Sequence, residues 1–428
     1  MLISIDTLRA DHLGLYGYSR PTSPGIDAFA EQAVVFEDAS STSPWTLPAH
    51  ASLFSGRYPE HHRLTSFERR LPLGVETIAA RLTQLGFDTR AVVNTHLLTN
   101  RFGLDYGFAK LKYVEEALVR VSPSTWVTDQ AMEWIAEPRE RPMFLFMHYY
   151  DVHSDYAALP RYRERFERPY EGEIDGSTLH LKEFRHGLRS IDARDADHLI
   201  DLYDAGVRQT DEEIDRLFAF LHERGELDTS LVVLTSDHGE EFLEHGSVLH
   251  GASQYAEVLR VPLILRYPPV LPPLRVRSPV SLVDVVPTIL GLLGEAPMDG
   301  IDGLDLSPLW NDPNAETILG FDERALFTSA DHSTTALEDE AKMFNISRSI
   351  RQGNFKLIYD TTTKTRELYD LRADPAEQVD IAAARSDVAD QLARALSALD
   401  SGSVGEGASV ELTDAEKELI EALGYGTQ

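Results

Sequence analysis

The chain has 428 residues, 43% of them hydrophobic, which is enough apolar material for one large core and a smaller one. This composition excludes a disordered chain and a minimal disulfide-stapled scaffold. Its 40 Lys and Arg against 70 Asp and Glu give a formal charge of −30 at pH 7, so no nucleic acid polymer is expected as a partner. The absence of cysteine excludes disulfides, thiolate metal ligands and any cofactor made by modifying a cysteine.

The opening residues, MLISIDTLRAD, contain neither a basic segment nor an apolar run of the kind that a secretion signal carries. Elsewhere, no apolar run is long enough to span a bilayer. We therefore expect no membrane span and favour the cytoplasm, although a leader removed upstream would leave no trace in this sequence.

Short apolar runs predict buried strands, and the amphipathic stretches between them predict helices. Strands are expected at 2–5, 33–36, 90–93, 143–148, 231–234 and 261–265. Helices are expected at 74–85 and 199–223. Buried strands that alternate with amphipathic helices are typical of an α/β fold with a doubly wound, mainly parallel sheet.

The second half of the chain changes character. Residues 155–195 are highly charged and predict a surface insertion, and the apolar stretch 282–293 predicts a helix despite its proline. A Pro-, Gly- and Asp-rich passage then predicts a linker, which divides the chain into a large domain, 1–313, and a smaller C-terminal α+β subdomain, 314–428. For the subdomain we expect antiparallel strands in ISRSIRQGNFKLIY and RELYDL, and helices near 384–398 and 413–423.

Three apolar runs each lead to an aspartate, namely Asp6, Asp151 and Asp237. Because the carboxyl ends of parallel strands face one crevice, these carboxylates are expected to meet there and bind a metal. His153 and His238 follow closely and add nitrogen ligands, a mixture that suits zinc or manganese better than calcium. Taken singly, each aspartate is more simply interpreted as a cap of the next helix, and the occurrence of three of them beside histidines favours the metal site.

The segment 45–56 places Thr46 at the start of a predicted helix whose first turn contains Pro48. A threonine there can be an ordinary N-cap. The backbone N–H groups and the helix dipole also favour an anion at this place, and a neighbouring cation would help to deprotonate the hydroxyl. His50 lies one turn further along the same face and can reach the same anion.

Six motifs in order resemble the sulfatase family of the alkaline phosphatase superfamily. The run TLPAHASLFSG, which begins at Thr46, is similar to the signature C/S-x-P-S-R-x-x-L-x-T/S-G, whose first residue is the catalytic position. The other five are ISIDTLRADHLGLYGY, GFDTRAVVNTHL, TSDHGE, HGASQYAEVLRVPLI and the C-terminal pair RQGNFKLIY with ELYDLRADPAE. The resemblance implies that the large domain is a sulfatase-like catalytic domain.

The chain departs from the sulfatase pattern at the nucleophile and metal positions. Thr46 stands where sulfatases carry the Cys or Ser that is converted to formylglycine, so formylglycine is not expected as a cofactor. Thr7 replaces the second aspartate of the opening motif, which removes one carboxylate ligand. Ala49 and His50 replace the Ser and Arg of the signature, and His238 replaces the Asn of the calcium-binding pair.

Two substrate-binding lysines of the sulfatase pattern are also replaced. Asn94 takes the place of the first, although the histidine two positions later is retained as His96, and His250 takes the place of the second. Asn94 and His96, together with Asp151, are therefore expected to bind the anionic group of the substrate.

A threonine nucleophile with Asp and His ligands resembles the phosphodiesterase, phosphotransferase and phosphatase branches of the superfamily, and this resemblance implies roles. A divalent metal is expected on Asp6, Asp237, His238 and Thr46. The expected catalytic residues are Thr46, His50, His153 and His250. The last two would contact the non-bridging oxygens, protonate the leaving group or, with Asp151, hold a second metal. Each of these histidines also has a structural alternative. His148, His245, His61 and His62 are interpreted as structural, and Glu240 as favouring a helix start.

Three functional hypotheses remain. The first is a metal-dependent hydrolase that cleaves a phosphate mono- or diester through Thr46, on a small-molecule, glycan or lipid substrate. The second is a sulfatase that cleaves sulfate esters with unmodified threonine. The third is a catalytically inactive protein of the same fold that binds metal or glycan.

Overall fold

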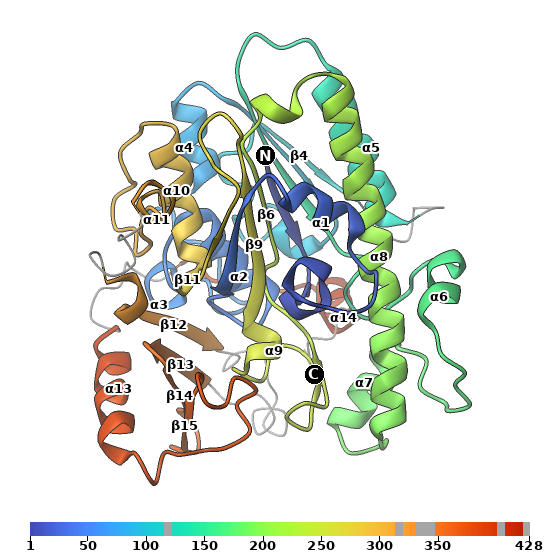
Figure 1. Cartoon of the computed structure of the whole chain (residues 1–428), viewed down its shortest axis with the longest axis vertical. Helices are drawn as coiled ribbons and strands as arrows, with labels where there is room; N and C mark the ends of the chain where they lie inside the picture. Colours follow the sequence, from blue (N-terminus) through green and yellow to red (C-terminus); the bar gives the residue numbers. More distant parts are fainter. Residues whose placement is uncertain (115–121, 313–319, 331–346, 400–406, 423–428) are drawn as a thin grey trace.

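A computed structural model describes residues 1–114, 122–312, 320–330, 347–399 and 407–422. Within these residues, nine strands form one sheet in the order β10-β2-β9-β6-β1-β5-β3-β4, and β11 pairs with β2 (Figure 1). The bounds are β1 (Leu2–Ile5), β2 (Val34–Ser40), β3 (Asp88–Val93), β4 (Lys110–Tyr113), β5 (Met143–Tyr149), β6 (Val232–Thr235), β9 (Arg260–Arg266), β10 (Leu274–Val276) and β11 (Val280–Ser281). Only β9 runs antiparallel to its neighbours, so the prediction of a mainly parallel sheet is confirmed.

Helices cover both faces of this sheet. Successive residues of β1 and β5 point to opposite faces: Leu2 and Phe146 enter one hydrophobic core, whereas Ile3 and Met147 enter the other. The first core includes residues of α2 (Thr46–Ser55), α4 (Ile78–Gln84) and α10 (Val285–Leu292). The second includes residues of α1 (Pro24–Ala30), α5 (Pro123–Ala136) and α8 (Ala193–Glu223). Burial on both faces explains why the strands read as continuous apolar runs.

Two helix starts differ from the predicted ones because of capping residues. The helix α8 begins at Ala193 rather than at 199, since the Asp192 carboxylate accepts hydrogen bonds from the first backbone N–H groups of the helix. Conversely, α4 begins at Ile78 rather than at 74, since Thr77 Oγ1 accepts a hydrogen bond from the backbone N–H of Ala80 at 3.2 Å.

The charged insertion at 155–195 contains two helices that the charge pattern did not reveal, α6 (Pro160–Phe166) and α7 (Thr178–Arg185). The helix α6 packs beside α8, where Tyr162 and Phe166 bury their rings against Ala205. Isolated apolar anchors among many charges therefore attach this segment to the large domain, although no sustained period marks it in the sequence.

A second sheet forms the C-terminal part. Its antiparallel strands run in the order β12 (Ala325–Ala330), β13 (Ser347–Gln352), β14 (Phe355–Asp360) and β15 (Arg366–Asp370). The helix α13 (Ser386–Ala398) packs against it through Leu392 and Leu396, and α14 (Asp414–Ala422) follows. The strands β13, β14 and β15 and both helices agree with the prediction, whereas β12 was not predicted. The proposed domain boundary at 313/314 lies beside the segment 313–319, outside the described residues, and stays a prediction.

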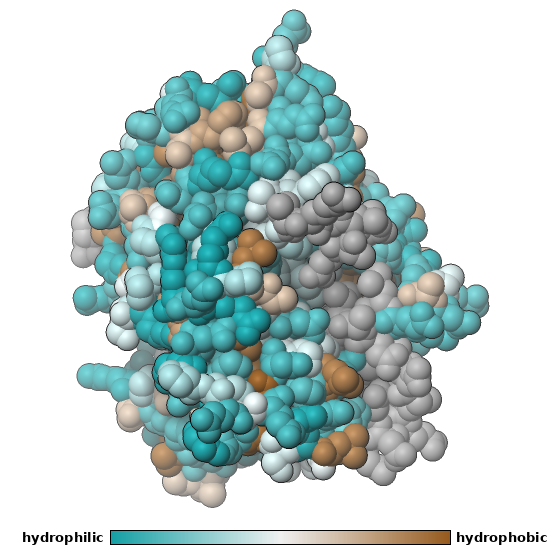
Figure 2. Space-filling model, turned by 90° about the vertical axis from the view of Figure 1, so that its right-hand side faces the viewer, coloured by the Kyte–Doolittle hydropathy of each residue, from teal (hydrophilic) through white to brown (hydrophobic). Residues whose placement is uncertain are grey.

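The acidic composition is visible on the surface. Figure 2 shows one side of the molecule as mostly hydrophilic, with small apolar areas between the polar ones. Within the part of the chain that the structure describes, no helix combines the length and the apolar character needed to cross a membrane.

Candidate active site

Three segments that lie far apart in the sequence meet at the carboxyl end of the central strands. Asp6 follows β1, Asp237 and His238 follow β6, and Thr46 begins α2; all four side chains are buried. Thr46 Oγ1 lies 3.4 Å from Asp6 Oδ2 and 3.3 Å from His238 Nε2. His238 Nε2 in turn lies 3.4 Å from Asp237 Oδ2. The structure thus brings together the four residues expected around a metal.

The chemistry of this cluster fits a divalent cation. Asp6 Oδ1 and Asp237 Oδ2 are buried without a hydrogen-bond partner, which costs about 1–3 kcal/mol for each such group. Ligand atoms of Asp6, Asp237 and His238 all lie within 4.8 Å of one another. Burial raises the pKa of both carboxyls, and the charge of Asp6 raises that of Asp237 further. A cation between them would compensate the buried charge and use the unpaired oxygens.

The position of Thr46 at the helix start differs from that of an N-cap. The cap residue is Trp45, and Thr46 is the first helical residue, with its hydroxyl directed to Asp6 and His238. One turn later, His50 Nδ1 lies 2.9 Å from the carbonyl oxygen of Thr46, and its Nε2 lies 3.0 Å from Ser4 Oγ of β1. His50 therefore connects the helix α2 to the central strand β1.

The turn that follows Asp6 is held by a tyrosine from α8. Thr7 has a φ of 55°, a left-handed conformation that is unfavourable for a β-branched residue. The Tyr203 hydroxyl donates a hydrogen bond to the carbonyl oxygen of Thr7 at 2.7 Å and accepts one from the backbone N–H of Arg9 at 2.8 Å. The N–H of Thr7 donates to Asp237 Oδ1 at 3.3 Å, so this turn also orients the second aspartate.

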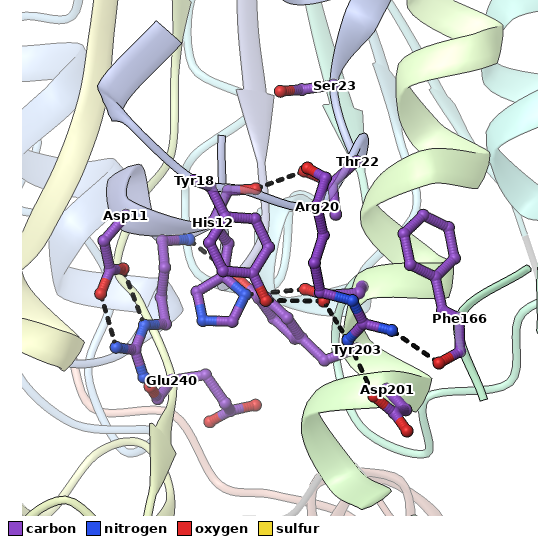
Figure 3. Close-up of polar contacts among 12 residues, drawn as sticks. Asp11, His12, Tyr18, Arg20, Thr22, Ser23, Phe166, Asp201, Tyr203 and Glu240 are labelled. Atoms are coloured by element: carbon purple, nitrogen blue, oxygen red, sulfur yellow. Dashed lines mark hydrogen bonds and ion pairs between the residues drawn. The ribbon is translucent and has the colours of Figure 1, made fainter. Parts of the chain in front are cut away.

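A network of paired charges surrounds this turn (Figure 3). Arg9 pairs with Asp11. His12 Nδ1 lies 2.8 Å from Asp204 Oδ1, and the Tyr18 hydroxyl donates to Asp204 Oδ2 at 2.7 Å. Arg20 bridges Asp204 and Asp201 on α8. The network fastens the segment after β1 to the long helix.

His153 and His250 lie beside this cluster. Their ring centroids are 4.9 Å apart, and the ring of His250 is 4.4 Å from that of His238. Burial lowers the pKa of His153 to about 4, and its Nδ1 lies 2.7 Å from the carbonyl oxygen of Ser154. The neutral imidazole therefore donates Nδ1–H there and keeps the lone pair on Nε2, which has no hydrogen-bond partner.

Glu240 is a functional candidate that the sequence reasoning misread. Instead of a helix start, the structure has the short strand β7 (Glu241–Phe242) next to it. Glu240 Oε1 lies 2.8 Å from Nδ1 of His250, and Glu240 Oε2 accepts a hydrogen bond from Tyr156 at 3.0 Å. Its position two residues after the pair Asp237-His238 was the sequence feature that could have identified it as a candidate.

His148, which the sequence analysis interprets as structural, is a further candidate metal ligand. It is fully buried in β5, in register with Ser4, and neither ring nitrogen has a hydrogen-bond partner. Its Nε2 lies 3.2 Å from Asp6 Oδ2. Its position near the end of the strand beside the one that leads to Asp6 was the signal that could have found it.

Asp151 requires a correction. Its carboxylate accepts hydrogen bonds from the Ser122 hydroxyl at 2.8 Å, from the backbone N–H of Ser124 at 2.7 Å and from the Gln209 amide at 2.6 Å. The Ser124 hydroxyl donates to it as well. With its oxygens occupied at the start of α5, Asp151 holds that helix in place and is not available to a substrate or a second metal.

Asn94 and His96 lie at the end of β3, which β5 separates from β1. Asn94 Nδ2 donates to the carbonyl oxygen of Val114 at 3.0 Å, and its Oδ1 is buried without a partner. Burial lowers the pKa of His96, whose ring lies 6.0 Å from that of Tyr113. The role of both residues in anion binding stays a prediction.

The fold and the site define an ester hydrolase of the alkaline phosphatase superfamily. A family model described as Sulfatase matches residues 1–295, and one described as N-sulphoglucosamine sulphohydrolase, C-terminal, matches residues 244–401. The chain belongs to the sulfatase family. This result confirms the family, the fold class and the enzymatic nature expected from the motifs.

The proteins that are similar in sequence include sulfatases, and the structures with a similar fold include phosphonate monoester hydrolases. The chain is 24% identical to an N-acetylglucosamine-6-O-sulfatase of Bacteroides thetaiotaomicron over an alignment of 454 positions. This alignment covers 86% of this chain and 80% of the relative. It resembles the phosphonate monoester hydrolase of Agrobacterium radiobacter with a TM-score of 0.77 and 21% identity, over 93% and 94% of the two chains. A protein solved with its substrate, D-glucosamine-2-N,6-O-disulfate, gives a TM-score of 0.76 and 20% identity, over 93% and 96%.

Proposed function

We propose that this protein hydrolyses a phosphate mono- or diester with Thr46 as the nucleophile. The observation that carries the proposal is the position of Thr46 Oγ1, which lies 3.4 Å from Asp6 Oδ2 and 3.3 Å from His238 Nε2 at the start of a buried helix. Without cysteine in the chain, and with threonine at the signature position, the hydroxyl acts as translated. The substrate is an anionic ester of a small molecule, a glycan or a lipid.

The metal proposed for this site is zinc or manganese rather than calcium, held by Asp6, Asp237, His238 and Thr46. Imidazole is a good ligand for transition metals, whereas calcium prefers oxygen ligands throughout. When bound, such a cation acts as a Lewis acid that stabilises negative charge on the ester and favours ionisation of the nucleophile.

The protein groups then divide the proton transfers. Thr46 donates its hydrogen bond to Asp6 Oδ2, and this carboxylate accepts the proton as the threonine oxygen forms its bond to phosphorus. The proton returns to Thr46 when water hydrolyses the phosphothreonine. His250, whose Nδ1 faces Glu240, gives a proton to the leaving oxygen as the old ester bond breaks. His153, neutral with a lone pair on Nε2, accepts a proton from the water that hydrolyses the phosphothreonine.

A second candidate is sulfate-ester hydrolysis by the same unmodified threonine. Two observations favour it: residues 244–401 match the C-terminal family model of an N-sulphoglucosamine sulphohydrolase, and the relative described above is a sulfatase. The geometry at Thr46 is compatible with attack on sulfur as well as on phosphorus.

The test is a substrate panel with defined metals. The metal-free protein would be assayed with p-nitrophenyl phosphate, its phosphodiester and phosphonate analogues and p-nitrophenyl sulfate, each with added Zn²⁺, Mn²⁺ or Ca²⁺. We expect turnover of a phosphorus ester with Zn²⁺ or Mn²⁺. Turnover of the sulfate alone would select the second candidate, and no turnover with any metal would select an inactive binding protein.

A further inference from the structure

The geometry points to a second divalent-cation position, held by His50, His148 and Asp237, next to the proposed catalytic metal. Ligand atoms of these three residues lie within 4.8 Å of one another, and all three side chains are fully buried. This inference deepens the proposed function and rests on the metal centre assigned there. Asp237 belongs to both groups of ligands and would bridge the two cations.

His148 is the first observation. An imidazole that binds a metal is neutral and carries one N–H and one lone pair. Both nitrogens are buried, yet neither has a hydrogen-bond partner, although Nε2 is only 3.2 Å from Asp6 Oδ2. Such orphaned groups are rare in folded proteins because each costs free energy. A cation in contact with the ring accounts for this arrangement.

His50 supplies a second nitrogen through a change of tautomer. Its Nδ1 lies 2.9 Å from the carbonyl oxygen of Thr46 and 3.5 Å from Asp237 Oδ2, and both of these oxygens are acceptors. Its Nε2 can donate to Ser4 Oγ at 3.0 Å, which leaves the Nδ1 lone pair directed toward the two oxygens. In this tautomer, a cation can bind the Nδ1 lone pair of His50 together with Asp237 Oδ2.

Asp237 has its two oxygens in different roles. Oδ1 accepts hydrogen bonds from the backbone N–H groups of Thr7 and His238, at 3.3 and 2.9 Å. Oδ2 has no hydrogen-bond partner and lies between two imidazoles, 3.4 Å from His238 Nε2 and 3.5 Å from His50 Nδ1. It is therefore the oxygen that both cations would share.

The second cation would also balance the negative charge of Asp237, since the other two proposed ligands, His50 and His148, are imidazoles that bind a metal in the neutral form. A cation bound to two imidazoles and one carboxylate is a transition metal such as Zn²⁺ or Mn²⁺ rather than Ca²⁺.

The experiment counts metal ions per chain. Full-length protein would be stripped with a chelator, saturated with Zn²⁺, dialysed and analysed for metal, alongside His148→Ala, His148→Gln and His238→Ala. We expect two ions in the unmodified protein and one in each variant. In a parallel Mn²⁺-loaded sample, two ions that share a carboxylate give a spin-coupled EPR spectrum, which the His148 variants would lose.

The control is His198→Ala, which removes a buried histidine whose ring stacks on Tyr170 at 3.9 Å. It should retain both ions. Circular dichroism would confirm that each variant is folded, and the glutamine variant replaces the alanine variant if the latter does not fold. One ion in the unmodified protein and in the His148 variants, with none in His238→Ala, would overturn the second position while leaving the catalytic metal intact. Two ions that persist without His148 would overturn it as well.

Discussion

Two clusters of buried polar side chains lie on either side of the turn after β1, and they differ in how their charges are satisfied. In the cluster around the proposed metal position, Asp6 Oδ1, Asp237 Oδ2 and both nitrogens of His148 have no hydrogen-bond partner. In the network of Figure 3, the single carboxylate of Asp204 contacts a histidine, a tyrosine and an arginine.

We interpret the unpaired groups as candidates for binding a metal or a substrate, and the paired groups as residues that stabilise the fold. Buried charges that are fully paired form a rigid connection, here between the segment after β1 and α8. Buried oxygen and nitrogen atoms that have no hydrogen-bond partner cost free energy, and a bound ligand can offset that cost. The comparison predicts that variants of the first cluster lose activity with the fold intact, whereas variants of the second lose stability.

The largest effect is expected for Thr46→Ala. Loss of the nucleophile should lower kcat by about a thousand-fold or more, because the covalent route is no longer available. Thr46→Ser, which keeps the hydroxyl, is the matched control and should retain most of the activity. Steady-state kinetics on the best substrate of the panel would measure both. A rate in Thr46→Ala equal to that of the unmodified protein would mean that water attacks directly.

The next effect is expected for Asp204→Ala. Its removal leaves His12, Tyr18 and Arg20 without their shared partner, and breaking a buried ion pair in this way costs about 3–5 kcal/mol of unfolding free energy. Urea unfolding at pH 7 would measure the loss. Asp11→Ala, at a more exposed carboxylate of the same network, should cost far less. Equal losses would show that the network does not act through buried pairing.

A smaller effect concerns pH. Burial lowers the pKa of His62 from its ordinary 6.5 to about 3. At His62 the unfolded chain therefore binds a proton that the folded chain does not bind. The contribution of His62 to the free energy of unfolding is complete above pH 6.5 and is lost as the pH falls toward 3. His62 is expected to contribute about 1.4 kcal/mol per pH unit to the slope of the unfolding free energy, measured by urea unfolding between pH 6 and 4.

His62→Gln, which does not titrate, should flatten that slope. The neighbouring His61 gives the opposite sign, because its hydrogen bond to Asp302 raises its pKa. Its stabilising contribution is complete below pH 6.5 and is lost as the pH rises through its folded pKa. If His62→Gln and the unmodified protein lose stability equally on acidification, His62 is not the responsible group.

The smallest effect is expected for Tyr203→Phe. The change leaves the carbonyl of Thr7 and the N–H of Arg9 without their buried partner, which costs about 1–3 kcal/mol of unfolding free energy. Because this turn also orients Asp6 and Asp237, metal affinity should fall as well, as measured by competition with a chelating dye. Lower stability with unchanged metal affinity would limit Tyr203 to a structural role.

Asp6 and Asp237 follow strongly patterned strands, so the rule for parallel strand ends was sufficient to bring them together. Thr46 begins a helix, and its place beside them was predicted from the resemblance to the sulfatase family. The strand pattern does not reveal the partners of Asp151, which are Ser122, just before α5, and Ser124, in its first turn.

The parts that sequence could not provide depend on tertiary contacts. His148 looks like any core histidine until β1 and β5 are placed in register, which brings it to Ser4 and near Asp6. The helices of the insertion were missed because their apolar anchors, such as Tyr162, are few among many charges. Because of capping residues, α4 and α8 begin at other residues than predicted. The antiparallel strands of the C-terminal sheet, in contrast, have strong local signals.

Every residue of α2 is buried, and Thr46 itself is 1% exposed. An enzyme that modifies a folded protein has to reach its target, and this helix offers no such access. We therefore expect no enzyme to modify Thr46 after the chain has folded, and the proposed nucleophile is the threonine as translated. Protein made in a cell-free mixture, or in a host that lacks any machinery for maturing sulfatases, should have the same specific activity as protein from its native cell.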